Sequence, residues 1–378
     1  MRTIDMADWK VTRGQKRLIN KVLKSGRLTY GKVTQELEEE FAKLHKRKYG
    51  LFTNSGTSAL KISLGALKLK HGWEDGDEVI VPAVTFVATV NAVVMNNLTP
   101  VLVDVLPKTV NIDPAEIEKA ITKKTRAIIP VHLLGQVADM NVIDDIAEKY
   151  GLNIVEDSCE TMFVGTAGEW GDTACFSSYI AHLMVTGVGG FILTDDKELA
   201  TTMRSIMFHG RDESYLNIDD NSKQNIYEKR FHFPRFGYSD RATELEAALG
   251  LEDLKNHEQM IAKRQDNAIY LMSKLIGVPI TFPVIEPYRH AFMFFPMICG
   301  ARDELEPYLE KRGIRTRRMM PLTTQPIMKP YLKQDYPVAE MINQRGLLIG
   351  CHQYLKKRDL DYIVKTIRSF YEQDFRYR

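Results

Sequence analysis

Short apolar segments alternate with helical segments between residues 49 and 196, and this alternation constrains the fold more than any other feature of the sequence. The apolar segments are rich in β-branched and aromatic residues and have the length of buried strands. They are GLFTN (50–54), EVIVPA (78–83), TPVLVDV (99–105), RAIIPV (126–131), NIVED (153–157), ACFSSY (174–179) and GGFILTDD (189–196). Strands separated by helices need crossover connections, so we predict an α/β fold with a mostly parallel central sheet flanked by helices.

Helical periodicity flanks this region on both sides. Residues 15–46 carry apolar residues at helical spacing, with a turn at 25–31, and another helical stretch starts at residue 241. The segments that follow it suggest a smaller α+β unit. Because 378 residues are too many for one simple core, we predict a large domain, a small C-terminal domain and a short N-terminal lead. We place them at residues 12–250, 251–378 and 1–11, respectively.

The charge balance and the cysteines limit the kinds of partner. The chain has 51 Lys and Arg residues against 49 Asp and Glu residues, so no strong field favours nucleic acid or a membrane surface, and we expect a small-molecule partner. No apolar run approaches the roughly 20 residues of a membrane helix. The cysteines at 159, 175, 299 and 351 match neither a zinc motif, a disulfide scaffold nor an iron–sulfur site. We therefore expect a cytoplasmic protein without a metal centre.

Polar and aromatic residues collect where the predicted strands end. In open parallel sheets, ligands bind beyond the carboxyl ends of the strands, so we expect the chemistry to gather at this edge. The long aperiodic connection 209–236 is a candidate active-site loop. The residues that fall at the strand ends are Asn54 to Ser58, Thr85, Phe86, Asp157 and Ser177.

Three short motifs at this edge suit a ligand that carries a phosphate and a ring. NSGTSAL (54–60) puts small residues at the start of a helix, where N–H groups bind phosphate, although these residues are also ordinary N-caps. Asp157 can hold a pyridinium proton or cap a helix. Ser177 and His182, followed by TGVGG (186–190), provide a hydroxyl, an imidazole and a tight turn. A lone histidine is more often structural than catalytic, but the neighbouring motifs favour a catalytic role here.

Taken together, these segments resemble the DegT/DnrJ/EryC1/StrS family of sugar aminotransferases. The resemblance implies the fold-type-I aminotransferase fold, pyridoxal phosphate as cofactor and a homodimer. It extends through nearly the whole chain. The matching blocks are SGRLTYG, NSGTSAL, VPAVTFVATVNAV, PVLVDV, IIPVHLLGQVADM, VEDSCE, CFSSY with GVGGFILTDD, FGYSDRATELEAALG and IRTRRMMPLTTQP.

The resemblance also assigns roles to residues that would surround the cofactor. Phe86 takes the position of the aromatic ring that stacks on the pyridine, and Asp157 takes that of the partner of its nitrogen. Glu160 stands near the phenolic oxygen of the cofactor. The residues implied to contact the cofactor phosphate are Gly56, Thr57, Ser58 and Ser177.

Further residues are expected to contact the substrate or the other subunit. Ser239 and Arg241 lie in the block implied to cross to the neighbouring subunit of the homodimer. Arg317, together with Arg315 and Arg318, is a candidate to bind the diphosphate of a nucleotide-linked sugar. Solvated surface charge is an equally good interpretation for any one of these arginines.

His182 stands where the family has the lysine that binds the cofactor covalently. An imidazole cannot form that bond but remains an acid/base near neutral pH. The sugar 3-dehydratase branch of the family, which includes GDP-4-keto-6-deoxymannose 3-dehydratase, has the same replacement. The resemblance therefore implies a lyase that uses untethered pyridoxamine phosphate, glutamate as amino donor, and His182 as acid/base to remove the C3 hydroxyl of a nucleotide-linked 4-keto-6-deoxy sugar. Such reactions serve deoxysugar synthesis, including that of lipopolysaccharide O-antigen.

Some positions depart from the family pattern and leave alternatives open. Val188 replaces a glutamate, Ser239 replaces an asparagine, and Cys351 with His352 stands where many relatives have a proline.

One alternative to the dehydratase is an aminotransferase or isomerase-like enzyme with a non-lysine site. A second is a catalytically idle cofactor-binding or regulatory protein, and a third is an artificial lysine replacement in an ordinary aminotransferase.

Overall fold

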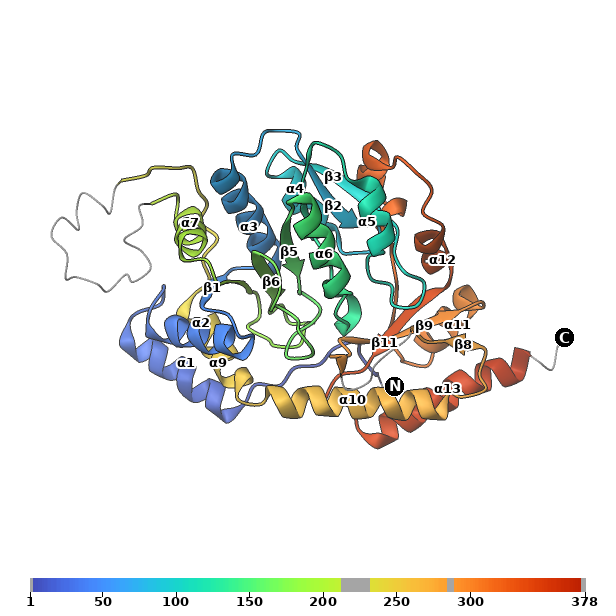
Figure 1. Ribbon diagram of the computed structural model, residues 1–378. Coiled ribbons are helices and arrows are strands. Elements are labelled where there is room, and N and C mark those ends of the chain that lie inside the picture. Colours follow the sequence, from blue (N-terminus) through green and yellow to red (C-terminus); the bar gives the residue numbers. More distant parts are fainter. Residues whose placement is uncertain (1–2, 212–231, 284–288, 375–378) are drawn as a thin grey trace.

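The computed structural model describes residues 3–211, 232–283 and 289–374 (Figure 1). Most of the candidate loop 209–236 therefore lies outside the described residues. The described chain builds a large sheet with helices on both faces and a second, smaller sheet formed by the C-terminal part.

The large sheet confirms the predicted α/β architecture. Its strand order is β1-β7-β6-β5-β4-β2-β3, and four neighbouring pairs in the run from β6 to β3 are parallel. β7 is antiparallel to both of its neighbours. All seven predicted segments form strands. These are β1 (Tyr49–Thr53), β2 (Glu78–Pro82), β3 (Thr99–Val103), β4 (Thr125–Ile128), β5 (Asn153–Asp157), β6 (Thr173–Ser177) and β7 (Gly190–Thr194).

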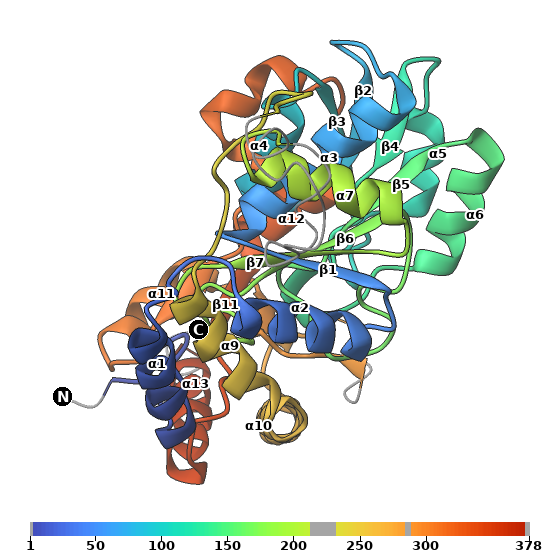
Figure 2. The ribbon, with the colours of Figure 1, turned by 90° about the vertical axis from the view of Figure 1, so that its left-hand side faces the viewer.

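Alternate side chains of the strands pack into two different helical layers, as the period of two in a strand requires. In β2, Val79 and Val81 join the core under α3, whereas Ile80 joins the core under α6. Figure 2 shows these two layers on either side of the strands. The layer with α3 (Gly56–His71) also contains α4 (Val87–Val94) and α7 (Lys197–Met207), and the layer with α6 (Met140–Tyr150) contains α5 (Pro114–Ala120).

The smaller sheet packs against the C-terminal helices. Its order is β10-β11-β9-β8, and all of its pairs are antiparallel. The start of the described chain belongs to this part, because Ile4 forms a parallel bridge with Ile314. Its strands are β8 (Ile280–Thr281), β9 (Phe294–Cys299), β10 (Thr316–Arg318) and β11 (Gly346–Gly350), and its helices are α10 (His257–Lys274), α11 (Arg302–Glu310), α12 (Pro337–Arg345) and α13 (Lys357–Asp374).

Local signals set the ends of the remaining helices. α1 (Arg13–Ser25) begins with a capping box between Thr12 and Gln15 and ends at Gly26, whose φ of 69° suits glycine. The predicted turn therefore separates α1 from α2 (Lys32–Leu44). The helical stretch from residue 241 divides into α9 (Glu244–Leu254) and α10.

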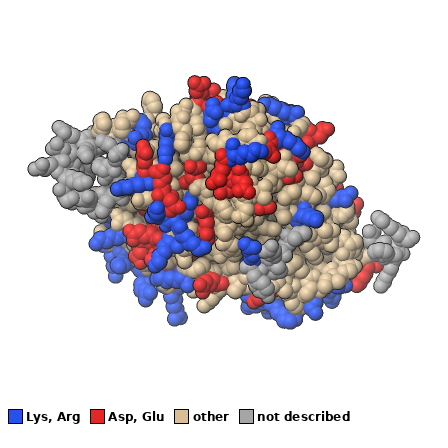
Figure 3. All heavy atoms as spheres, in the orientation of Figure 1, with Lys and Arg blue, Asp and Glu red and all other residues tan. Residues whose placement is uncertain are grey.

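The surface agrees with the charge balance of the sequence. Lys and Arg side chains are interspersed with Asp and Glu side chains on the face shown in Figure 3. Within the described residues, no helix is both long and apolar enough to cross a bilayer.

Candidate active site

The loops at the carboxyl ends of β1, β5 and β6 meet at Gly56. A Cβ atom at this position would lie 2.7 Å from the Sγ atom of Cys159 and 2.9 Å from the Cβ atom of Ser177. Both distances are shorter than real Cβ contacts, so glycine lets the start of α3 approach the ends of two strands. The structure thus brings together the motifs that the sequence predicts for this edge of the sheet.

The start of α3 has the features of a phosphate-binding turn. Ser55 is the N-cap, and its Oγ atom accepts a hydrogen bond of 3.1 Å from the N–H of Ser58. The amide of Ser58 is therefore already engaged by the cap, and its hydroxyl lies 3.1 Å from that of Ser55. The first N–H groups of a helix have no partner within it, so those of Gly56 and Thr57 suit an anion. Ser177, at the carboxyl end of β6, lies beside this turn, since its Cβ atom is close to Gly56.

Asp157 is the buried carboxylate of the site. It ends β5 and is 4% exposed. Its Oδ2 atom accepts a hydrogen bond of 2.8 Å from the hydroxyl of Thr89, and its Oδ1 atom accepts one of 3.2 Å from the N–H of Cys159. Burial raises the pKa of Asp157, while the hydrogen bonds from Cys159 and Thr89 act in the opposite direction. A group of positive charge beside it, such as a pyridinium, would favour its ionised form.

His182 is held in one tautomer by the backbone. Its Nδ1 atom lies 2.6 Å from the carbonyl oxygen of Cys159. A carbonyl only accepts hydrogen bonds, so Nδ1 carries the proton. Burial lowers the pKa of His182 to about 4, helped by the positive charges of Arg317 and Arg264. The ring is therefore neutral near pH 7, and its Nε2 atom has a lone pair that can accept a proton.

Glu160 connects the site to a cavity between the large sheet and the C-terminal part. Its Oε2 atom accepts a hydrogen bond of 2.8 Å from the N–H of Leu134. Burial raises the pKa of Glu160, and the positive charge of Arg317 offsets only part of this rise. The cavity has a volume of about 140 Å³. Its lining includes Thr85, Phe86, Leu134, Glu160, Arg317 and Met319.

Phe86 and Arg317 line this cavity from different parts of the fold. Phe86 is the N-cap of α4 and is 59% exposed, so its ring is available to a ligand. Arg317 lies in β10 of the smaller sheet. Within the described residues it forms no ion pair, whereas Arg315 pairs with Glu310 and Arg318 pairs with Glu306. Of the three arginines named from the sequence, Arg317 is the one that forms no ion pair within the described residues, although its charge acts on Glu160 in the same cavity.

Ser239 and Arg241 lie at the surface beside the end of β1. Arg241 donates a hydrogen bond of 2.9 Å to the Oγ atom of Ser239 and forms an antiparallel bridge with Thr53. The N–H of Asn54 donates to the carbonyl of Asp240 at 3.0 Å. This segment therefore supports the turn that leads into α3, and the side chain of Ser239 is exposed.

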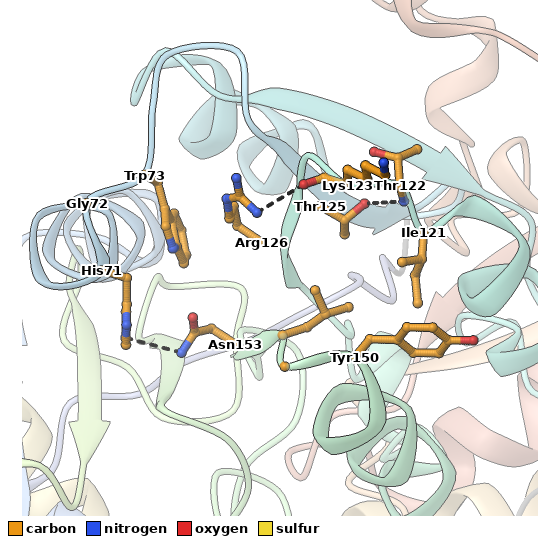
Figure 4. Close-up of a pocket in the computed structure, with 12 residues that line it drawn as sticks. His71, Gly72, Trp73, Ile121, Thr122, Lys123, Thr125, Arg126, Tyr150 and Asn153 are labelled. Carbon is orange, nitrogen blue, oxygen red and sulfur yellow. Dashed lines mark hydrogen bonds between the residues drawn. The ribbon is translucent and has the colours of Figure 1, made fainter.

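A second cavity shows that size alone does not locate the site. It has a volume of about 710 Å³ and lies at the amino edge of the sheet, where β2, β4 and β5 begin (Figure 4). His71, Trp73, Arg126 and Asn153 line it. Asp157 and Ser177 lie at the opposite ends of their strands, so this cavity is separate from the candidate site.

Sequence reasoning missed three partners that hold the predicted residues. They are the hydroxyl of Thr89, the carbonyl of Cys159 and the N–H of Leu134. Two of these are backbone groups, which leave no trace in residue identity. Thr89 carried a possible signal, since it lies three residues after Phe86, within the first turn of α4.

Comparisons with known proteins place the fold in the fold-type-I class of pyridoxal-phosphate-dependent enzymes. Residues 11–368 match the DegT/DnrJ/EryC1/StrS aminotransferase family, and the chain belongs to this family. GDP-perosamine synthase of Caulobacter vibrioides is 33% identical over 350 residues, which cover 89% of this chain and 90% of that protein. GDP-4-keto-6-deoxy-D-mannose 3-dehydratase of Yersinia pseudotuberculosis is 31% identical over 358 residues, with 89% and 90% covered.

The chain is also similar to solved structures that contain the cofactor. The GDP-4-keto-6-deoxy-D-mannose-3-dehydratase of E. coli with bound hydrated pyridoxal phosphate superposes with a TM-score of 0.89 at 27% identity, covering 97% of this chain and all of that one. A GDP-4-keto-6-deoxymannose-3-dehydratase with a trapped pyridoxal phosphate–glutamate adduct has the same score, identity and coverage. The chain is thus a pyridoxal-phosphate-dependent enzyme of a family that modifies nucleotide-linked sugars.

Proposed function

We propose that the protein is a dehydratase that removes the C3 hydroxyl of a nucleotide-linked 4-keto-6-deoxy sugar. The observation that carries this proposal is the hydrogen bond of 2.6 Å between the Nδ1 atom of His182 and the carbonyl of Cys159, which leaves Nε2 without a proton in the neutral ring. The sequence resemblance implies that His182 takes the position of the family's lysine. An imidazole moves protons but cannot bind the cofactor covalently. The 31% identical dehydratase of Yersinia pseudotuberculosis supports the same reaction class.

The residues at the carboxyl edge fit pyridoxal phosphate or pyridoxamine phosphate. Gly56 and Thr57 at the start of α3, with Ser177, would hold the phosphate, and Ser58 would support the turn through Ser55. Glycine at position 56 is what allows this turn to lie against Cys159 and Ser177. When bound, the cofactor supplies an electron sink.

Other residues would hold the ring of the cofactor. Asp157 would hold a proton at the ring nitrogen, and its burial strengthens the charge interaction. Phe86 would pack on the face of the ring, since it is exposed at the edge of the cavity that Glu160 also lines. Glu160 would face the phenolic oxygen and is kept in place by the N–H of Leu134.

His182 carries the proton transfers of the proposed reaction. Its Nε2 atom would accept the proton that is lost from carbon in the first step and would then donate it to the departing C3 hydroxyl, which leaves as water. The bond from Nδ1 to the carbonyl of Cys159 stabilises the protonated ring between these two events. The same bond fixes the ring orientation, so that one nitrogen serves both transfers.

The proposed substrate contact rests on the charge of Arg317, and the proposed subunit contact rests on the sequence resemblance. Arg317 would bind the diphosphate of the sugar nucleotide, because it lines the cavity and forms no ion pair within the described residues, unlike Arg315 and Arg318. We also propose a homodimer in which Ser239 and Arg241 reach the site of the other subunit, and glutamate as the amino donor. The glutamate adduct of the similar dehydratase structure supports that donor.

The pathway and the cellular location are part of the same proposal. A 3-deoxy-4-keto sugar is an intermediate suited to deoxysugar synthesis, of which lipopolysaccharide O-antigen is one product class. Four free cysteines, three of them buried, are consistent with a cytoplasmic protein.

An aminotransferase is the second candidate, because GDP-perosamine synthase is 33% identical to the chain. Mass spectrometry of the products separates the two activities. The protein would be incubated with pyridoxal phosphate, glutamate and a panel of nucleotide-linked 4-keto-6-deoxy sugars. A product that lacks one oxygen, with release of ammonia and 2-oxoglutarate, supports the dehydratase. A product in which an amine replaces the keto oxygen would reject it in favour of transamination.

A further inference from the structure

One short helix carries both a ring-stacking side chain and a partner of the buried carboxylate. Phe86 is the N-cap of α4, and Thr89 lies one turn later in the same helix. The hydroxyl of Thr89 is 2.8 Å from the Oδ2 atom of Asp157, which ends β5. Thr89 is completely buried, so this hydrogen bond is not in competition with water.

The direction of the hydrogen bonds follows from the chemistry of the groups. An ionised carboxylate only accepts hydrogen bonds, so the hydroxyl of Thr89 donates to Asp157. The single proton of Thr89 is then used, and the hydroxyl of Thr85, 2.9 Å away, must donate to the oxygen of Thr89. The result is a directed chain from Thr85 through Thr89 to Asp157. Thr85 also lines the cavity that Phe86 borders.

We propose that Thr89 is a positioning residue that keeps Asp157 ionised and correctly oriented. This inference rests on the proposed role of Asp157 at the ring nitrogen of the cofactor. A protonated Asp157 would not stabilise a positive ring, and burial favours that protonated state. The hydrogen bond from Thr89 opposes this effect of burial and favours the ionised carboxylate. An ionised Asp157 would keep the ring nitrogen of the cofactor protonated, and the protonated ring withdraws electrons.

The side chain of Asp157 is held by Cys159 and by Thr89. Its backbone is fixed on both sides, because its N–H donates to Pro130 at 2.9 Å and its carbonyl accepts from His132 at 3.0 Å. Its Oδ1 atom is held by the N–H of Cys159. The Thr89 hydroxyl holds the other oxygen, Oδ2, and thereby sets the rotation of the carboxylate plane.

The test compares variants at position 89, and the quantity measured is the protonation of the ring nitrogen of the bound cofactor. Thr89→Val keeps the shape of the side chain and removes the hydroxyl, and Thr89→Ser keeps the hydroxyl. Cofactor labelled with nitrogen-15 in the ring reports by NMR whether that nitrogen is protonated, and fluorescence titration gives its affinity. Circular dichroism checks that each variant is folded, and Thr89→Ala replaces Thr89→Val if the latter does not fold.

We expect Thr89→Val to lose the pyridinium signal at neutral pH and to bind pyridoxal phosphate about tenfold more weakly. Thr89→Ser should restore both properties. A folded variant without the hydroxyl that retains the pyridinium signal and full affinity would overturn the inference.

Asp157→Asn separates this inference from the proposed function. If Asp157→Asn abolishes the pyridinium signal while Thr89→Val does not, the role of Thr89 is wrong and the proposed role of Asp157 stands. If Asp157→Asn itself leaves the signal unchanged, the proposed site is wrong, and the inference about Thr89 is rejected with it.

Discussion

The Nδ1 atom of His182 lies 2.6 Å from the carbonyl oxygen of Cys159. Cys159 follows β5, whereas His182 lies in the loop after β6, so neighbouring parallel strands bring the two residues together. A carbonyl oxygen cannot donate a proton, which fixes the tautomer at all pH values where the ring is neutral.

Replacement of His182 by Asn should abolish proton transfer while cofactor binding remains. We expect the dehydration rate to fall at least about 100-fold, because general acid–base catalysis contributes at least that much. His71→Asn, at the amino edge of the sheet, is the matched control and should keep full activity. Product formation is followed by mass spectrometry and cofactor binding by absorbance. Wild-type turnover in His182→Asn would remove this residue from the mechanism.

Borohydride reduction should leave the cofactor unattached to the native chain. His182→Lys restores an amine at this position and should allow a covalent adduct after the same treatment. Intact-protein mass spectrometry detects the added mass, and peptide mapping locates it. A reduced adduct on a lysine of the native protein would contradict an untethered cofactor.

The pH profile should reflect the lowered pKa of His182. Because burial lowers this pKa to about 4, the base remains neutral and active down to about that pH. We expect kcat/KM to be constant between neutral pH and about pH 5, whereas an unperturbed histidine would lose activity below about 6.5. Arg317→Gln removes a positive charge that lowers the pKa of His182. The fall of kcat/KM on the acid side of the profile should therefore occur at higher pH in this variant.

Substitution of Arg317 should also weaken substrate binding. We expect Arg317→Gln to raise KM about tenfold or more, because a charge-assisted contact to phosphate is lost. Arg318→Gln is the matched control, since Arg318 already pairs with Glu306 and Asp303. Steady-state kinetics with the sugar nucleotide distinguish the two variants. Equal effects of both substitutions would argue for general surface charge rather than a defined contact.

Asp253 should make the free energy of unfolding depend on pH. Its carboxylate accepts hydrogen bonds from the N–H of Val185, in the loop of His182, and from Gln15, yet burial raises its pKa to about 6. The folded state therefore binds this proton more tightly than the unfolded chain, so stability falls as pH rises from about 4 to about 6.

Asp253→Asn removes this titrating group, and urea denaturation at several pH values measures the difference. Between about pH 4 and about pH 6, we expect the free energy of unfolding to fall less in this variant than in the wild type, by up to about 2 kcal/mol. Asp145→Asn, at an exposed position, should keep the wild-type profile. An unchanged slope in Asp253→Asn would show that the carboxyl of Asp253 does not titrate in this range.

The sequence was sufficient to predict the strands of the large sheet, because each is a short apolar segment bounded by turns. It also predicted which residues lie at the carboxyl edge, such as Asp157 and Ser177, since parallel strands align their ends. It could not predict that β7 runs antiparallel to β6, because the apolar pattern of a buried strand is the same in both directions.

Contacts between distant segments were also beyond the reach of residue patterns. The bond of Thr89 to Asp157 joins residues 68 positions apart, and the spacing of Thr89 from Phe86 does not identify Asp157 as its partner. The partners of His182 and Glu160 are backbone groups, which every residue type possesses. The proposed domain limits stay a prediction, as do the cofactor and substrate roles of the individual site residues.

The bridge between Ile4 and Ile314 has a consequence for folding during synthesis. The N–H of Ile4 donates to the carbonyl of Gly313 at 2.7 Å, and the N–H of Arg315 donates back to Ile4 at 2.9 Å. The ribosome makes Ile4 about 300 residues before its partners. Because these contacts lie directly before β10, the strand that carries Arg317, this arginine reaches its final surroundings only after most of the chain has emerged. The strands of the large sheet leave the ribosome earlier, and the side of the cavity that Arg317 lines is completed later.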